Sequence, residues 1–457
     1  MPVRELSRFG TLLTATVVGV YVLIIAGATA AIADAARVCT SWPVCRTPGS
    51  LADTQLLIGW GHRVLALVVG ALVLATVVAG LRADVERRVK LALLAGLALF
   101  PVQIGMGALV ATSGAAAPFP GLHLAVAMTI FTTLVVALAW TLEGGDDTPV
   151  SPDPEPAPMP EDLPEPQPPS GLRETAYAYF RLMKPRLMWL LCLVAAAGMA
   201  LSAGQSLTVP TILATLGGGV LAIGASGTFN HVLERDVDRR MERTNDRPTV
   251  TKQVPVRNAV AFGLVLAAAS MAVFLTVNLL TAALGLTAIL FYSVVYTLLL
   301  KPNTVQNTVI GGAAGALPAL IGGAAATGTI GLPGLALAGL VFLWTPAHFY
   351  NLALAYKDDY AAGGFPMMPV VRGEATTRKH ILWYLAATLL AAGAMTAVTD
   401  LGLLFALATV GVGAVFLWMV VRLHLERTES AAFRAFHASN AYLGAILIAI
   451  LIDTLAV

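Results

Sequence analysis

Charged side chains are scarce in this sequence. Of its 457 residues only 12% are charged, whereas 57% are hydrophobic, and the mean hydropathy is +0.79. About a quarter of the residues of a typical soluble domain are charged, so this chain has too few charges to cover a soluble surface of its size. Its net charge of only +2 gives no bulk attraction to nucleic acid, and we expect no nucleic-acid partner.

Long apolar runs fill most of the chain. A helix of about 20 apolar residues crosses the roughly 30 Å hydrocarbon core of a bilayer, so we predict an all-α integral membrane protein in contact with lipid. The first run has no clear cleavage site of a signal peptide. Thirteen transmembrane helices are predicted, at about residues 10–32, 58–82, 91–112, 121–142, 188–205, 208–229, 258–276, 279–300, 307–326, 330–350, 380–398, 401–422 and 438–457.

A proline-rich acidic segment separates the first four spans from the other nine. Residues 143–170 hold ten prolines and eight acidic residues but no Lys or Arg. Such a segment cannot bury an apolar core and is expected to be extended and solvated. We therefore predict a four-helix membrane domain at 1–142, a disordered linker at 143–172 and a nine-helix membrane domain at 173–457.

The basic residues are distributed unevenly between the predicted loops. With the N-terminus inside, only Arg37, Arg46 and Arg63 of the 28 Lys and Arg residues lie at the outer side. The positive-inside rule favours this orientation over its reverse. We predict a multi-pass protein of the cytoplasmic membrane, with both the N-terminus and the acidic motifs on the cytoplasmic side.

The chain contains only three cysteines. Cys39 and Cys45 lie in a loop that this orientation places outside, where an oxidising compartment favours a disulfide. A reactive thiol pair is the alternative. Cys192 lies within an apolar run, where a small buried thiol is the simplest interpretation.

The loop after the sixth span carries an amide and two acids at four-residue spacing. Asn230, Glu234 and Asp238 share one face if the helix continues beyond the membrane. Oxygen ligands on one face suit Mg²⁺, which is commonly shared between carboxylates and phosphates. Arg243 and Arg247 repeat the spacing and can clamp a diphosphate. A solvated helix with i,i+4 ion pairs is the alternative, but it leaves the amide and the two acids in register unexplained.

A second acidic pair and a basic residue lie on the same predicted side of the membrane. Asp358 and Asp359 follow the tenth span, and two acidic clusters on one face can hold metal ions that make a bridged diphosphate a good leaving group. Lys301 can bind a phosphate, and Tyr292 and Tyr296 can present π-faces to a carbocation. Snorkelling and an interfacial aromatic belt are the alternative for these last three residues.

Four segments together resemble the haem O synthase (protohaem IX farnesyltransferase) family of UbiA-type membrane prenyltransferases. The resemblance covers about residues 175–457, and its last two segments favour haem over a quinone precursor as the acceptor. The family has nine spans with both acidic loops at the cytoplasmic face, which matches the predicted topology. The segments are Lys184-Pro185-Arg186, residues 230–248, YTLLLKPNTVQNTVIGGAAGALP at 296–318 and PAHFYNLALAYKDDYAAGGFPMMP at 346–369.

The resemblance assigns roles to individual residues. It makes Asn230, Glu234 and Asp238 the first Mg²⁺–diphosphate motif, with Glu234 standing where many relatives have Asp. Asp359, with Asp358, represents the second motif, although alanines stand at the flanking positions where a DxxxD pattern has an acid. The substrate-binding candidates are Lys184, Arg186, Arg235, Arg243, Arg247, Tyr292, Tyr296, Lys301 and His348.

The implied reaction is an electrophilic prenyl transfer from farnesyl diphosphate to haem b, with Mg²⁺ as cofactor. Diphosphate leaves, a haem vinyl group attacks the allylic cation, and water completes the hydroxyfarnesylethyl group of haem O, which serves terminal oxidases. Positioning and charge stabilisation do most of the work, and the apolar bundle shields the cation from water. His348 is either a ligand of the haem iron or a packed histidine near the interface.

The first four spans carry two histidines at similar predicted depth near the outer face. His62 begins the second span and His123 begins the fourth. Two imidazoles at one level of a four-helix bundle can bind haem as a bis-imidazole pair. Interfacial packing is the alternative.

This segment resembles one four-helix half of haem A synthase, through His62, His123 and the loop from Cys39 to Cys45 with its Trp-Pro pair. Gly59 stands where relatives often carry Glu, and a second half is absent from the chain. A homodimer, or a haem A synthase partner, would rebuild an eight-helix unit. Otherwise the domain binds or passes haem without oxidising it.

Two other functions are alternatives for the whole chain. An aromatic quinone-precursor prenyltransferase would need no haem, but the second DxxxD motif that such an enzyme uses is missing. A non-catalytic haem-binding or oxidase-assembly membrane protein is disfavoured by the intact acidic motifs.

Overall fold

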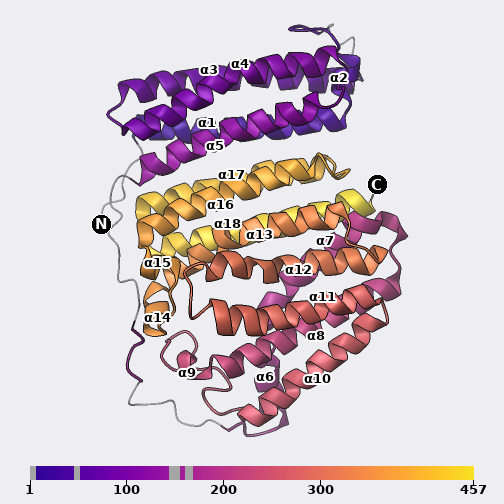
Figure 1. Cartoon of the computed structure of the whole chain (residues 1–457), viewed down its shortest axis with the longest axis vertical. Coiled ribbons are helices and arrows are strands. Elements are labelled where there is room, and N and C mark those ends of the chain that lie inside the picture. Colours follow the sequence, from indigo (N-terminus) through magenta and orange to yellow (C-terminus); the bar gives the residue numbers. More distant parts are fainter. Residues whose placement is uncertain (1–6, 46–51, 144–154, 160–167, 457) are drawn as a thin grey trace. The chain divides into compact units, whose positions relative to one another are not determined.

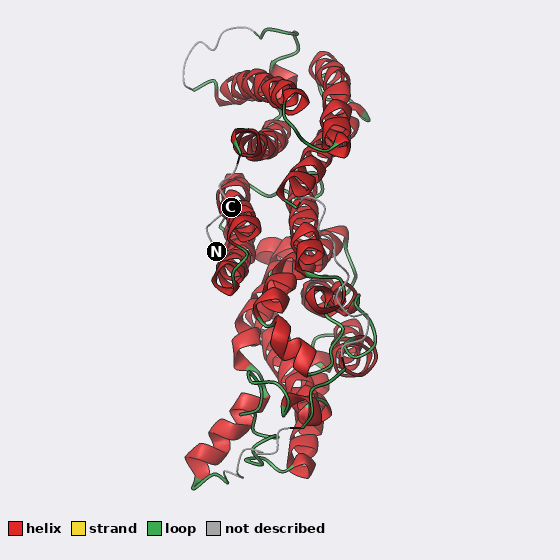
Figure 2. Ribbon diagram, turned by 90° about the vertical axis from the view of Figure 1, so that its left-hand side faces the viewer, coloured by secondary structure: helices red, strands yellow, loops and turns green. Residues whose placement is uncertain are grey.

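The described part of the chain consists of helices and the loops that join them. The computed structural model describes residues 7–45, 52–143, 155–159 and 168–456, and no strand occurs within those ranges (Figures 1 and 2). In a bilayer only a helix or a closed barrel satisfies every backbone N–H and C=O group internally. The prediction of an all-α membrane protein is confirmed.

Twelve helices of the described residues are long and apolar enough to cross a membrane, against thirteen predicted. The difference is α16 (Glu374–Met395), which coincides with the predicted span at 380–398 but opens with charged residues that lower its hydropathy. The twelve are α1 (Arg8–Ile32), α3 (Thr54–Arg82), α4 (Arg87–Thr112), α5 (Phe119–Leu142), α7 (Pro185–Ala203) with the turn η1 (Gly204–Ser206), α8 (Val209–Leu233), α10 (Val256–Leu275), α11 (Leu279–Leu290) with the π-helix η2 (Phe291–Leu300), α12 (Asn307–Thr327), α13 (Leu332–Ala355), α17 (Leu403–Glu426) and α18 (Glu429–Leu455).

Within the described loops, five short helices were not predicted. Of these, α6 buries Ala178 and Leu182 against Val254 and Ala259, so a short amphipathic helix closes over the start of α10. The five are α2 (Ala35–Val38), α6 (Leu172–Leu182), α9 (Arg235–Asp238), α14 (Lys357–Ala362) and α15 (Met368–Val371).

The chain divides by contacts into two units. Unit 1 contains Met1–Asp146 and Leu382–Ala431, and unit 2 contains Asp147–Ile381 and Ala432–Val457. The division passes through α16 and α18.

In unit 1, four helices form a closed ring of contacts. Helix α1 packs on α3 and α5, while α4 packs on the other faces of α3 and α5, and α17 adds contacts to α1 and α5 (Figure 1). A buried hydrogen bond of 2.6 Å joins the hydroxyls of Thr16 and Thr76 across α1 and α3. Leu13 and Phe131 are fully buried in this interior.

In unit 2, glycines let the helices that carry the site cross closely. A Cβ atom at Gly198 of α7 would meet the carbonyl oxygen of Ala319, and one at Gly322 of α12 would meet the carbonyl oxygen of Ala195. This reciprocal arrangement brings the backbones of α7 and α12 into contact, as small residues commonly do in membranes. Helix α8 in turn packs on α7, α10 and α11.

One described piece of the proline-rich segment, residues 155–159, packs against the end of α14 within unit 2. The N–H of Ala157 donates to the carbonyl oxygen of Ala362 at 2.9 Å. Pro156 lies beside Gly364, whose φ of +73° and missing side chain leave room for the proline ring. Residues 155–159 are thus held beside the end of α14, although four of the five are exposed.

Candidate active site

The first acidic motif lies where α8 ends. The helix stops at Leu233, and Glu234 separates it from α9, so the helix does not run unbroken as expected. The spacing is nevertheless preserved, because the N–H of Glu234 donates to Asn230 O at 3.0 Å and the N–H of Asp238 donates to Glu234 O at 2.8 Å. The side chains of Asn230, Glu234 and Asp238 are buried, with exposed fractions of 2%, 4% and 1%.

Two basic residues bind the carboxylates directly. Lys301 Nζ lies 2.6 Å from Glu234 Oε1, and Arg247 Nη1 lies 2.6 Å from Asp238 Oδ2 and 3.6 Å from Glu234 Oε2. Charges taken out of water are tolerated only when they are paired and hydrogen-bonded. The structure thus brings two predicted diphosphate-binding residues onto the first acidic motif.

The amide of the motif is held by two further side chains. Lys184 Nζ donates to Asn230 Oδ1, and Asn230 Nδ2 donates to Thr297 Oγ1 at 3.1 Å. Thr297 in turn donates to the carbonyl oxygen of Tyr292 at 2.9 Å. The sequence did not single out Thr297, because one threonine in an apolar run carries no signal of its own.

The π-helix η2 explains why these residues meet. Its hydrogen bonds join residues five apart, for example from the N–H of Lys301 to Tyr296 O at 2.8 Å. Such wide turns are rare in proteins, but where they occur they often lie at functional sites. A sequence pattern analysed with a period of 3.6 residues cannot reveal this change of register.

Burial and charge together set the ionisation of the cluster. Burial and the charge of Arg247 lower the pKa of Lys184 to about 7. Burial raises the pKa of Asp238 despite its contact with Arg247. Burial also raises the pKa of Glu234, but the charges of Lys301 and Lys184 outweigh it and the pKa lies below its ordinary value. The site contains three basic groups for two carboxyl groups, which suits an anionic ligand.

The donor atoms fit a magnesium ion shared with a phosphate. Asp238 Oδ1 is buried and has no hydrogen-bond partner, and a buried acceptor of this kind is costly unless it binds a donor or a cation. Across the described ranges, no three His, Cys, Asp or Glu side chains converge as a complete metal site. A magnesium ion bound by this motif would complete its coordination with water and substrate oxygens, which is the usual arrangement for Mg²⁺.

The second acidic pair is divided between two environments. Asp359 accepts hydrogen bonds from the N–H groups of Glu242 and Arg243, at 2.8 and 3.0 Å, so its carboxylate fastens the loop after α9 to α14. The side chain of Asp358 is 98% exposed. Asp359 is thus hydrogen-bonded to the backbone of the loop that follows the first acidic motif.

The remaining predicted basic residues lie further from the carboxylates. The Arg243 guanidinium lies 4.9 Å from the ring centre of Tyr356 and 5.6 Å from that of Tyr360. Arg235 pairs with the aspartate that follows it in sequence, and Arg186 is exposed at the start of α7. The structure therefore groups Lys184, Arg247 and Lys301 at the motif, whereas Arg186, Arg235 and Arg243 lie around it.

An apolar cavity of about 280 Å³ begins beside the cluster. Lys184, Tyr292 and Tyr296 line it together with apolar residues of α7, α8, α12 and α13. The two tyrosine rings lie 5.6 Å apart, and Lys184 Nζ lies 5.7 Å from the ring centre of Tyr292. The predicted aromatic residues are therefore part of the cavity wall next to the charged groups.

His348 is packed between aromatic rings. Its imidazole stacks on Trp344 and Phe436, with centroid distances of 4.3 and 4.4 Å, and its Nδ1 lies 2.6 Å from Ser439 Oγ. These contacts fix the ring plane, and one ring nitrogen is already hydrogen-bonded. His348 is thus packed between two aromatic rings, and its assignment as a ligand of the haem iron stays a prediction.

In unit 1, the two histidines occupy matching positions. His62 of α3 lies against Gly27 of α1, and His123 of α5 lies against Gly107 of α4, where an added Cβ would meet the imidazole Cε1 at 3.1 and 3.2 Å. The Nδ1 atom of each ring is buried without a hydrogen-bond partner. His123 Nε2 lies 3.3 Å from Gln103 Nε2.

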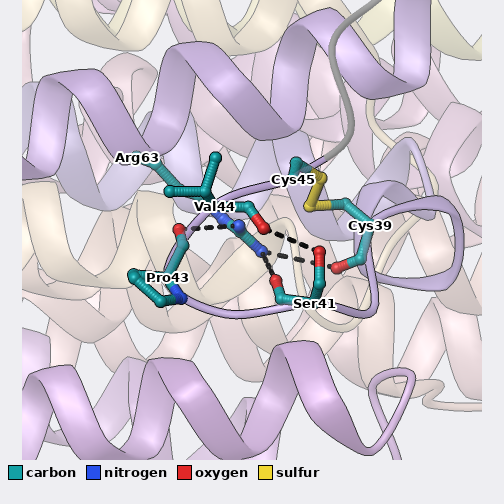
Figure 3. Close-up of a disulfide and its surroundings, with 6 residues drawn as sticks. All are labelled: Cys39, Ser41, Pro43, Val44, Cys45 and Arg63. Carbon is teal, nitrogen blue, oxygen red and sulfur yellow. Dashed lines mark hydrogen bonds between the residues drawn. A yellow bond between two sulfur atoms is a disulfide. The ribbon is translucent and has the colours of Figure 1, made fainter.

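A disulfide joins Cys39 and Cys45 (Figure 3). Figure 3 shows the Arg63 guanidinium inside this loop, where it donates to the carbonyl oxygens of Pro43 and Ser41 at 3.0 Å and of Cys39 at 3.4 Å. Because Arg63 follows His62 on α3, the loop is fastened beside the first histidine.

Comparison with known proteins identifies the family. Residues 191–444 match the model of the UbiA prenyltransferase family. The chain therefore belongs to this family, as the motifs predicted.

The relatives specify the reaction more closely. Proteins named protoheme IX farnesyltransferase from Haloarcula marismortui and Natronomonas pharaonis are each 65% identical over 99% of both chains. A protein of the same name from Nocardia farcinica is 43% identical, over 63% of this chain and 93% of its own. These names match the activity predicted from the sequence motifs.

A solved structure supports the fold alone. A digeranylgeranylglyceryl phosphate synthase superposes with a TM-score of 0.53 at 14% identity, covering 62% of this chain and all of its own. The membrane helices of the UbiA type are thus present, whereas identity this low says nothing about the substrate.

Proposed function

We propose that the site of unit 2 transfers a farnesyl group from farnesyl diphosphate to haem b and forms haem O. The observation that carries this proposal is a buried cluster of three basic and two acidic side chains at the mouth of an apolar cavity. An anionic head fits the cluster and an isoprenoid chain fits the cavity. The names of the full-length relatives support haem as the acceptor.

The basic residues hold the diphosphate. Lys184, Arg247 and Lys301 converge on the acidic motif and can each donate to phosphate oxygens. Asn230, Glu234 and Asp238 would hold Mg²⁺, which when bound neutralises the charge that develops on the leaving diphosphate. Thr297 keeps the Asn230 amide oriented.

The cavity walls protect the reacting carbon. The C1–O bond of farnesyl diphosphate breaks with its electron pair on the diphosphate, and the terminal carbon of a haem vinyl group bonds to C1. Water then adds to the other vinyl carbon and loses a proton. The rings of Tyr292 and Tyr296 face the position of the cation, and the apolar lining excludes water before the carbon–carbon bond forms.

A product assay tests the proposal. Detergent-purified protein with haem b, farnesyl diphosphate and Mg²⁺ should yield a haem whose mass has increased by a hydroxyfarnesyl group, and EDTA should abolish this product. Haem that remains unmodified while it binds to the protein would refute the proposal and favour the haem-carrier alternative. Prenylation of an aromatic quinone precursor instead of haem would favour the other alternative.

We also propose that the protein has the domain boundaries and the membrane orientation that the sequence predicts. The prenyltransferase domain comprises residues 173–457 and the four-helix domain residues 1–142, with the acidic motifs cytoplasmic and the disulfide loop outside. The unequal distribution of Lys and Arg supports this orientation.

For the four-helix domain we propose haem binding between His62 and His123, as in one half of haem A synthase. The support is the pair of buried, unpartnered Nδ1 atoms on rings that each lie against a glycine. A homodimer or a haem A synthase partner would complete an eight-helix unit.

His62→Ala and His123→Ala should each abolish the visible spectrum of a bis-imidazole haem but leave haem O formation intact. An unchanged spectrum in both variants would refute the assignment.

A further inference from the structure

An aromatic ring covers the ammonium group of Lys301. Its Nζ atom lies 4.2 Å from the ring centre of Phe365 and 2.6 Å from Glu234 Oε1. A cation within about 6 Å of the face of an aromatic ring is attracted by the negative potential of that face. Lys301 is therefore held by two partners, a carboxylate on α8's end and a ring from a different part of the chain.

The Phe365 ring is fixed by the segment between α14 and α15. The N–H of Phe365 donates to Tyr360 O at 2.9 Å, and its carbonyl oxygen accepts from the N–H of Met367 at 2.7 Å. The side chain is 4% exposed and packs in an apolar cluster with Met241, Tyr360 and Met367. A Cβ at Gly363 would lie 3.2 Å from the ring atom Cδ2. A ring packed this closely has little freedom to turn away from Lys301.

The ring leaves the positive charge of Lys301 available to a ligand. An ammonium group has three N–H donors, and within the described residues Glu234 is the one hydrogen-bond acceptor of Lys301 Nζ. A second carboxylate would cancel the charge that attracts a diphosphate, whereas an aromatic face attracts the ammonium group without adding a net charge. Phe365 thus restricts the position of the ammonium group and leaves donors for phosphate oxygens.

We propose that Phe365 positions Lys301 for the diphosphate of the prenyl donor through this cation–π contact. The inference rests on the proposed prenyl transfer and adds a positioning residue to it. A lysine ammonium group lies at the end of a flexible four-carbon stem, and the ring confines it beside Glu234, where the diphosphate binds. A ring with a less negative face restrains Lys301 less and lowers the affinity for the diphosphate.

Fluorination of the ring tests the contact at almost constant shape. Fluorine withdraws electron density from the π-face, so mono-, di- and trifluorinated phenylalanine in place of Phe365 should weaken the cation–π attraction in that order. The probe is farnesyl thiodiphosphate, a slowly reacting analogue that keeps the diphosphate, bound to detergent-purified full-length protein with Mg²⁺ and measured by calorimetry. Its Kd should rise at each step and reach about 10-fold for the trifluorinated ring, the scale of a desolvated cation–π contact. Phe365→Leu, which removes the ring, should raise Kd at least as much.

The same series at Phe262 is the matched control. Phe262 packs against Tyr179 at a centroid distance of 5.0 Å, in an apolar cluster beside α6, and fluorination there should leave Kd unchanged. A Kd that does not depend on the number of fluorine atoms at position 365 would overturn the inference, even if Phe365→Leu binds weakly, because the ring would then act by packing alone. An equal trend at Phe262 would also overturn it. A wild-type protein that does not bind the probe would instead refute the proposed function, so the two failures are distinguishable.

Discussion

Asp238 combines the features expected of a metal-binding acid in this fold. One carboxylate oxygen binds Arg247, and the other is buried without a partner. Its position was predictable from the four-residue spacing alone. Its contact with Arg247 was not predictable, because Arg247 lies nine positions further along the chain and its approach to Asp238 depends on how the intervening loop folds.

Asp238→Asn should reduce kcat for haem O formation by at least about 100-fold, the scale seen when a group that stabilises transition-state charge is removed. The amide preserves the shape but loses the charge that binds the metal ion. Asp236→Asn is the matched control, since Asp236 lies on the same short helix with its side chain 64% exposed. Equal rates in the two variants would contradict the assignment.

Thr297→Val should lower kcat by about 10-fold with little change in KM for the diphosphate. The valine leaves the buried Nδ2 group of Asn230 without an acceptor, at a cost of about 1–3 kcal/mol. Thr297→Ser keeps the hydroxyl and should restore the rate. If Thr297→Ser is as slow as Thr297→Val, the hydroxyl is not what positions Asn230.

At the scale of elements, α14 acts as an anchor for the loop after α9. Both oxygens of Asp359 bind backbone N–H groups of that loop, and Arg243 of the loop lies over Tyr356 and Tyr360. The sequence predicted that two acidic clusters would meet on one side of the membrane. It did not predict that the carboxylate of Asp359 would bind the loop that follows the first acidic motif. Backbone N–H donors have no signature in a sequence.

Asp359→Ala should increase amide hydrogen exchange at Glu242 and Arg243, because both N–H groups lose their acceptors. Asp358→Ala, a change at a side chain 98% exposed, is the control and should leave exchange unchanged. If Asp359→Ala instead raises only the Mg²⁺ concentration needed for half-maximal activity, Asp359 is a metal ligand and not an anchor.

At the scale of the whole molecule, the topology determines which groups share a compartment. The proposed orientation places the loop between α9 and α10 inside and the disulfide loop outside. In right-side-out vesicles of a chain whose native cysteines are replaced by serine, Asp246→Cys should react with a membrane-impermeant maleimide only after permeabilisation. Ser41→Cys should react with the same reagent in intact vesicles, without permeabilisation. The reverse pattern would invert the topology and place the acidic motifs outside.

The sequence by itself determined the helical class, the approximate positions of the spans, the first acidic motif and the family. These features depend on local composition, on a four-residue period and on motifs that are contiguous in the chain. Twelve of the thirteen predicted spans satisfy the criteria of length and hydropathy in the described residues, and α16 falls short because of its charged first turns.

Only the tertiary structure decided which basic residues face the carboxylates, that Thr297 orients Asn230 and that Asp359 binds backbone N–H groups. Each of these depends on contacts between residues distant in sequence. The π-helical register of η2 and the close crossings at glycines determine those contacts. Neither follows from local pattern, because both are consequences of how the helices pack against one another.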